Sequence, residues 1–152
     1  MLSFLKILFT FAATLFVGDI ILMLFWKLRA ERTKDPHVTL FANKTVMFTD
    51  NTLLGPAAML TAISGNLLAP RIGLQIYSTP ALSIAMGSFI LSGIVWSFFL
   101  IPTQKKQLKI CAELNAGNEL PAEYFQLASR WEKWGYVAAL LVLLSLFLIV
   151  LG

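Results

Sequence analysis

The sequence predicts an all-α fold: an integral membrane four-helix transmembrane bundle with both termini on the non-cytoplasmic side. Three observations predict it. The 152 residues are 58% apolar and only 13% charged, whereas a soluble domain carries roughly 25% charged residues. The mean hydropathy is +0.77. Four stretches also have the roughly 20 apolar residues that a helix needs to cross a membrane. The length fits a single membrane domain, residues 1–152.

The four predicted spans are long and continuous. A strand of a membrane barrel needs only about 10 alternating residues, so a barrel is excluded. The first stretch ends in a positively charged run from Trp26 to Arg29, and no cleavage site of small residues follows it. We therefore expect a retained helix and not a signal peptide. The spans lie at about 2–26, 50–69, 79–101 and 131–151.

The basic residues predict the orientation. Of the 12 Lys and Arg residues, all except Lys6 and Arg71 lie in the first and third connections between the spans. The positive-inside rule places these two connections in the cytoplasm. The net charge of +4 then reflects orientation, together with contact with anionic lipids of the bilayer at the cytoplasmic face. We expect no nucleic-acid binding.

Several classes of site are excluded by composition. Cys111 and His37 are the single cysteine and the single histidine, which excludes a disulfide scaffold and a metal site built mainly from these ligands. A nucleophilic Ser-His-Asp set is excluded too, because His37 lies in a connection. We therefore predict no catalytic residues, no metal and no cofactor.

The helix boundaries follow from capping signals and prolines. The polar run 27–33 is compatible with an extension of the first helix. Asp35-Pro36 is typical of a helix start, with an N-cap acid before proline at the first helical position. The third helix is predicted to stop at Pro102, and a short amphipathic helix around Leu108 and Ile110 is predicted to lie on the inner membrane surface. A turn is expected at 115–118.

The two remaining boundary signals concern the second and fourth helices. The run from Leu120 to Glu123 starts a helix that continues into the fourth span. Pro56 disturbs the second helix, since it removes a backbone donor and clashes with the carbonyl of Thr52. Two readings stay open there: a tolerated kink at the membrane surface, or a polar pocket opened at the kink.

Small residues recur at helical spacing and predict helix-packing seams. Such residues let backbones approach closely, and in lipid this packing drives association. The second helix carries one such row and the third helix carries three pairs: Ala57, Thr61, Gly65 and Ala69; Ser83 and Gly87; Ser88 and Ser92; Gly93 and Ser97.

Asp19 is the most informative polar residue, because it lies inside the first span. It is about eight residues from the charged end, hence roughly 12 Å deep. An acid at such depth needs a partner, hydration or a proton. Counting equal depths predicts an inner-leaflet polar cluster of Asp19, Asp50, Asn51 and Trp96. A cytoplasmic mouth of Lys44, Gln104 and Arg130 would close it. The cluster is either a structural hydrogen bond between helices or a proton, ion or ligand site.

Three runs of residues resemble a known family. They are Phe16-Val17-Gly18-Asp19 continuing to Phe25 through Thr33, Ser92 through Trp96 with Ile101 through Gln104, and Tyr124 with Ser129 through Trp131 and Trp134-Gly135. Together they resemble the bacterial predicted integral membrane proteins catalogued as domain of unknown function 2269. The resemblance covers nearly the whole chain. It implies four spans, a multi-pass location in the cell inner membrane and no assigned activity.

The resemblance also bears on the chemistry. Members of that family usually carry asparagine where Asp19 stands, which argues against a proton relay common to the family. More distantly, the chain resembles copper-resistance D-type membrane bundles and the membrane protoporphyrinogen oxidase type, which uses intramembrane histidine for haem. The predicted spans contain no histidine, which excludes bis-histidine haem.

Three classes of function remain, in this order. The first is a non-enzymatic protein that binds or assembles with partners, either copies of itself or other membrane proteins, through its helix seams. The second is a small permease or a proton- or ion-handling protein centred on Asp19 and Asp50. The third is a membrane redox protein with a bound cofactor.

Overall fold

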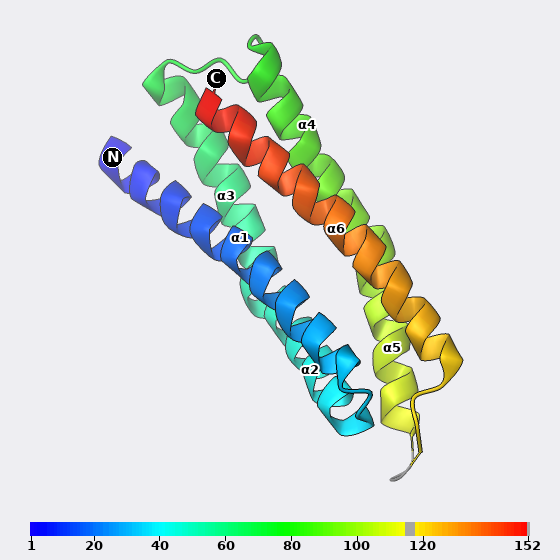
Figure 1. Ribbon diagram of the computed structural model, residues 1–152. Coiled ribbons are helices and arrows are strands. Elements are labelled where there is room, and N and C mark those ends of the chain that lie inside the picture. Colours follow the sequence, from blue (N-terminus) through cyan, green and yellow to red (C-terminus); the bar gives the residue numbers. More distant parts are fainter. Residues whose placement is uncertain (115–117, 152) are drawn as a thin grey trace.

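The computed structural model describes residues 1–114 and 118–151, which form a bundle of four long helices (Figure 1). All four are long and apolar enough to cross a membrane, which confirms the predicted all-α transmembrane bundle. The first and last are single α-helices, whereas the second and third contain non-α turns. Their segments in chain order are α1 (Leu2–Arg32), α2 (Pro36–Thr49), η1 (Asp50–Leu54), α3 (Gly55–Leu68), η2 (Ala69–Ile72), α4 (Pro80–Val95), η3 (Trp96–Leu100), α5 (Ile101–Glu113) and α6 (Ala122–Leu151).

The helices pack in two pairs that meet near the middle. α1 lies along α3, and α4 lies along α6, while α2, α5 and α6 come together at one end of the bundle. Figure 1 shows both termini at the opposite end, together with the segment that joins η2 to α4. Termini at one end agree with an even number of spans. The side of the membrane on which they lie stays a prediction.

Three predicted helix boundaries are confirmed. α1 continues through the polar run to Arg32. The Asp35 carboxylate accepts hydrogen bonds from the backbone N–H groups of His37 at 2.8 Å and Val38 at 3.4 Å, so it caps α2. α6 starts at Ala122 and reaches Leu151 without a break. The turn expected at 115–118 falls mostly on residues 115–117, outside the described residues.

Pro56 and Pro102 each follow a π-helical turn, η1 and η3 respectively. In η1 the N–H of Gly55 bonds to the carbonyl of Asp50, and in η3 the N–H of Ile101 bonds to the carbonyl of Trp96, each five residues back. The wider turn accommodates a proline ring that would clash in a regular α-helix, and it shifts the hydrogen-bond pattern by one residue. The predicted stop at Pro102 is therefore wrong.

The segment after Pro102 is also placed differently from the prediction. α5 continues the third helix to Glu113 and packs against α2 and α6. The short surface helix predicted around Leu108 and Ile110 is thus the end of the third helix. The buried residues of α5 explain why, since its inner face carries Thr103, Gln104, Gln107 and Cys111.

The small-residue seams are confirmed in part. Ala57, Thr61 and Ala69 are buried on α3, and a Cβ added to Gly65 would lie 3.1 Å from Cε2 of Phe9 on α1. Ser92 on α4 donates a hydrogen bond of 3.1 Å to the carbonyl of Ala138 on α6.

Two predicted seam positions face open space instead. A Cβ at Gly87 or Gly93 would meet no heavy atom of another described residue within 4 Å. The α4–α6 seam therefore follows the buried Ser88 and Ser92 and not these glycines.

Two glycines provide a matched test of how closely α6 packs. A Cβ at Gly135 would meet Cδ2 of Leu24 at 3.1 Å, whereas one at Gly18 would meet nothing within 4 Å among the described atoms. We expect Gly135→Leu to destabilise the fold by about 1–3 kcal/mol through overpacking. Gly18→Leu, which gains the same helix propensity, should be neutral or stabilising. Unfolding in detergent micelles, followed by circular dichroism, measures both. Equal stabilities would show that α6 can shift away from α1.

Candidate functional site

A buried ion pair lies where the four helices meet. Lys27 of α1 is only 1% exposed. Its Nζ lies 3.1 Å from Oε1 of Glu31 and donates to Oδ1 of Asn43 on α2 at 2.5 Å. The same Nζ lies 4.8 Å from the centroid of the Trp131 ring on α6, a cation–π distance. The charge of Lys27 is thus compensated by a carboxylate, an amide and an aromatic face.

Two further side chains extend this pair to α5 and α6. The Tyr124 hydroxyl donates to Oε1 of Glu31 at 3.1 Å and accepts from Nδ2 of Asn43 at 2.8 Å. Nε2 of Gln107 donates to the same carboxylate oxygen at 3.3 Å. Tyr124 and Gln107 are both fully buried. We call these residues the Lys27 network: Lys27, Glu31, Asn43, Gln107 and Tyr124.

A cavity of about 100 Å³ adjoins this network at the level of the two π-helical turns. We call it the Asp50 cavity. Asp50 is the first residue of η1 and Trp96 the first of η3, so the two turns bring a carboxylate and an indole to the same space. A Cβ at Gly55 would lie only 3.2 Å from the Asp50 carbonyl oxygen, so a glycine at this position avoids crowding that oxygen. The polar residues that line the Asp50 cavity are Asp50, Ser92, Trp96, Gln104 and Trp131. Phe16 and Phe89 contribute aromatic walls.

Several polar atoms around this cavity are buried and unpaired. Oδ2 of Asp50, Nε1 of Trp96 and Nε1 of Trp131 have no hydrogen-bond partner within residues 1–114 and 118–151. The side chains of Gln104 and Trp96 lie close to the Asp50 carboxylate. Buried polar groups in proteins are nearly always paired, with water or a ligand where protein atoms do not reach. The residues that line the Asp50 cavity therefore carry one unpaired acceptor and two unpaired donors among the described atoms.

The charge of Asp50 is also uncompensated. In the described part of the chain, the ion pairs are Lys27–Glu31 and the exposed Lys109–Glu113. Asp50 is 4% exposed, and burying an ion without a partner is costly. A bound cation or a proton on the Asp50 carboxylate would each remove this cost.

The structure places the predicted site residues in two groups. Asp50, Trp96 and Gln104 line the Asp50 cavity. Asp19 does not line it, although its neighbours Phe16 and Ile20 do. Oδ2 of Asp19 is nevertheless buried and unpaired among the described atoms. Asp19 is also close enough to Asp50 for the charges of the two carboxylates to interact.

The other predicted residues lie on the outside. Lys44, Asn51 and Arg130 are exposed. Nδ2 of Asn51 donates to the carbonyl of Met47 in its own helix at 2.7 Å. Neighbouring residues on a helix point about 100° apart, so Asp50 and Asn51 do not share a face. Among the described residues, no three His, Cys, Asp or Glu side chains are grouped so as to hold a metal ion.

The sequence reasoning missed the Lys27 network. A detectable signal was present, because Asp19, Met23, Lys27 and Glu31 follow one another at intervals of four, which places them on one face of a helix. Gln104, Gln107 and Cys111 share a face of the third helix in the same way. Lys27 was instead assigned to the charged end of the first span, where lysines usually reach water.

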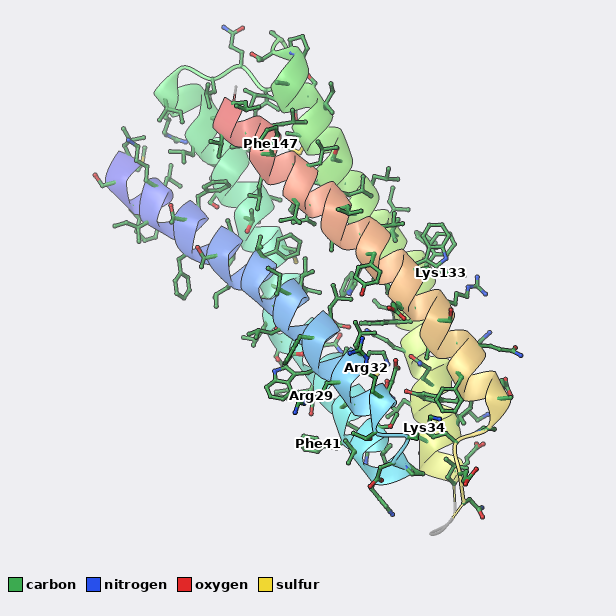
Figure 2. The ribbon with its side chains drawn as sticks, in the orientation of Figure 1. Arg29, Arg32, Lys34, Phe41, Lys133 and Phe147 are labelled. Atoms are coloured by element: carbon green, nitrogen blue, oxygen red, sulfur yellow. The ribbon has the colours of Figure 1, made fainter. Side chains whose placement is uncertain are left out.

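Exposed cations surround this half of the bundle. Figure 2 shows Arg29, Arg32 and Lys34 close to the α1–α2 connection, and Lys133 on α6. All four are exposed. Phe41 on α2 is 72% exposed. An exposed aromatic ring beside arginines is typical of a membrane–water interface.

The Lys27 network yields a test of buried charge. Lys27→Met should destabilise the protein by about 3–5 kcal/mol, because Glu31 keeps a buried charge without a partner. The double variant Lys27→Met/Glu31→Gln should recover a large part of this loss. In the exposed control pair, Lys109→Met should cost less than about 1 kcal/mol. Unfolding in micelles measures all three. A double variant as unstable as Lys27→Met would show that packing around Lys27, and not its charge, is decisive.

Comparison with known proteins agrees with this architecture. The family described as predicted integral membrane protein (DUF2269) matches residues 3–151. No curated protein and no solved structure matches the chain. With the match extending over nearly every residue and four helices able to cross a membrane, the chain belongs to the DUF2269 family of predicted integral membrane proteins.

Proposed function

We propose that the chain is a non-enzymatic binding protein of the membrane that holds a small cation in the Asp50 cavity. One observation carries this proposal: the Asp50 carboxylate is 4% exposed, lines a cavity and has no cationic partner among the described residues. The nearest buried cation, Lys27, is already engaged by Glu31. A bound cation would compensate the charge of Asp50 in a region of low dielectric constant.

The walls of the cavity favour an organic ammonium ion. Trp96, Trp131, Phe16 and Phe89 line the cavity together with Asp50, and aromatic faces attract cations that have shed part of their water. The indole N–H groups of the two tryptophans are donors and cannot bind the cation itself. A water that accepts from one indole N–H and from the ammonium group would link that donor to the ligand. A volume of about 100 Å³ admits a small ammonium ion with such a water, which takes about 30 Å³.

Replacement of Asp50 tests the binding site. Trp96 and Trp131 line the cavity, so tryptophan fluorescence of the micellar protein should change on titration with methylammonium chloride. We expect Asp50→Asn to weaken the affinity at least roughly tenfold, because a charge-assisted hydrogen bond is lost.

Glu123 provides the control, because it is an exposed carboxylate at the start of α6. Glu123→Gln should bind methylammonium like the unmodified chain. Potassium chloride at equal ionic strength corrects for screening. If Asp50→Asn titrates like the unmodified chain, the cation site is refuted.

The second candidate is a small permease or a proton- or ion-handling protein centred on Asp19 and Asp50. It is favoured by Asp19, a second intramembrane carboxylate with a buried, unpaired oxygen close to Asp50. Acids inside membranes commonly mark ion and proton pathways. Transport by a chain with only four spans would require a homodimer or a larger assembly.

Asp19→Asn distinguishes the two candidates. In proteoliposomes that contain a pH-sensitive dye, a binding protein should leave the proton leak at the level of protein-free vesicles, with or without methylammonium. A permease should show flux that falls roughly tenfold or more in Asp19→Asn, because an amide cannot carry the proton. Flux that Asp19→Asn leaves intact would exclude Asp19 from any pathway.

The proposal also covers the orientation of the protein in the membrane and its contacts with lipid. We infer that the end carrying Arg29, Arg32 and Lys34 faces the cytoplasm at the inner membrane and contacts anionic lipids, since these cations are exposed there beside Phe41. Homo-oligomers or other membrane proteins would pack against the exposed apolar faces of the helices.

A further inference from the structure

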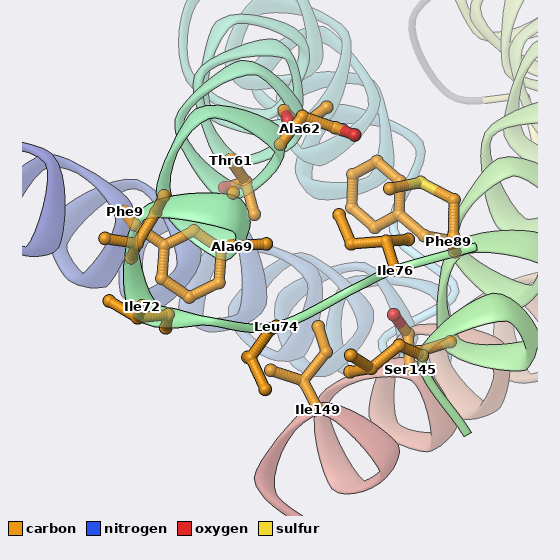
Figure 3. Close-up of a pocket in the computed structure, with 16 residues that line it drawn as sticks. Phe9, Thr61, Ala62, Ala69, Ile72, Leu74, Ile76, Phe89, Ser145 and Ile149 are labelled. Carbon is orange, nitrogen blue, oxygen red and sulfur yellow. Dashed lines mark hydrogen bonds between the residues drawn. The ribbon is translucent and has the colours of Figure 1, made fainter. Parts of the chain in front are cut away.

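A second cavity of about 120 Å³ lies at the end of the bundle that carries the termini. Figure 3 shows it between Phe9 of α1, Ala69 at the end of the second helix and Ile149 of α6. Leu74 and Ile76, from the segment that joins η2 to α4, cover it. Phe89 lines both this cavity and the Asp50 cavity, so its side chain borders the two.

The geometry of the helices explains why this space is open. α1 lies along α3 and α4 lies along α6, while Figure 1 shows α3 and α4 apart at this end, with the joining segment crossing between them. Among larger apolar side chains, the lining contains four small residues: Ala62, Gly65, Ala69 and Ala85. Short side chains cannot fill the gap that the diverging helices leave.

The walls offer few polar groups to a ligand. Three polar side chains line the cavity: Thr61, Asn66 and the buried Ser145. Thr61 donates to the carbonyl of Ala57 at 2.7 Å and Asn66 donates to that of Ala62 at 2.9 Å. A water needs two to four polar partners, and apolar cavities of this size stay dry and take up apolar molecules. The occupant is therefore an apolar group.

The surroundings identify the source of that group. The wall residues Thr61 to Ala69 and Leu82 to Phe89 belong to helices able to cross a membrane, so lipid chains surround the cavity. Arg71 is exposed in η2, between the lining residues Ala69 and Ile72. It has no ion-pair partner in the described part of the chain. Among residues 1–114 and 118–151, its guanidinium group donates through one nitrogen, Nη1, to the carbonyl of Leu67.

We propose that this cavity binds one acyl chain of a phospholipid, whose phosphate lies at Arg71. An acyl chain supplies the apolar surface that the walls lack, and a phosphate supplies the acceptor that arginine binds most readily. The site is independent of the Asp50 cavity, because its ligand is neutral where it is enclosed. A second copy of the chain would instead have to insert a side chain under Leu74 and Ile76.

Photolabelling tests the site. The full chain is placed in nanodiscs that contain a phosphatidylglycerol with a diazirine at the end of one acyl chain, and labelled residues are mapped by mass spectrometry. We expect labelling of Leu74, Ile76 and Met86 to exceed that of Ile84, which is 55% exposed on the same helix as Met86. Equal labelling, or crosslinks of these residues to a second copy, would overturn the proposal.

Matched variants sharpen the test. Ala62→Phe fills the cavity from its wall and should lower labelling of Ile76 and Met86 roughly tenfold. Ile63→Phe is the control, since Ile63 is 54% exposed and lies outside the lining. If Ala62→Phe does not fold, Leu74→Trp fills the same space from the joining segment. Cavity labelling that persists in a folded filling variant would overturn the acyl-chain site.

The phosphate contact has its own variant. Arg71→Gln should also lower cavity labelling, because the headgroup loses its cation. Unchanged labelling in Arg71→Gln would overturn the assignment of the phosphate to this residue.

Discussion

Every backbone donor and acceptor inside a hydrocarbon layer has to be satisfied by the segment itself or by a close neighbour, and prolines obstruct this in two of the four helices. The chain resolves the conflict in the same way twice, with a π-helical turn at Asp50–Leu54 and another at Trp96–Leu100, each shortly before a proline. The two turns meet across one cavity, which both Asp50 and Trp96 line. The backbone turns that accommodate the prolines thus also place Asp50 and Trp96 at the candidate site.

Two polar regions lie next to each other and differ in how far their hydrogen bonds are met. In the Lys27 network, Lys27, Glu31, Asn43 and Tyr124 satisfy one another across three helices. Oε1 of Gln107 is the member atom that lacks a partner within the described residues. A buried network of this kind fixes the relative positions of helices. In the Asp50 cavity, by contrast, a carboxylate oxygen and two indole nitrogens lack partners among the described atoms. The first region has the properties of a structural clamp, and the second has those of a binding site.

The sequence predicts the architecture well because lipid imposes simple rules. Apolar length located the four helices, and the Asp35-Pro36 signal located the start of the second. Pro102 was misjudged, because proline usually ends a helix and the sequence does not reveal that a π-helical turn accommodates it. Asp50 and Trp96 were predicted to share one polar cluster and Gln104 to lie at its cytoplasmic mouth, and all three line one cavity in the structure.

Rotation about a helix axis was harder to predict than depth. Asn51 has the same depth as Asp50 but is exposed, and Lys27 points inward from a stretch in which Arg29 and Arg32 point outward. Such directions depend on which helix faces which, and that information lies in contacts between distant segments. The row from Asp19 to Glu31 at intervals of four contained part of it.

The placement of the π-helical turns also determines how the molecule can deform. α1 and α6 are unbroken α-helices of 31 and 30 residues. The second and third helices each contain a π-helical turn, and both turns lie beside the Asp50 cavity. Wide turns and prolines are where helices bend most readily. Bending of the second and third helices is therefore expected at the level of these two turns. Such bending would displace the Asp50 carboxylate and the Trp96 indole before other side chains.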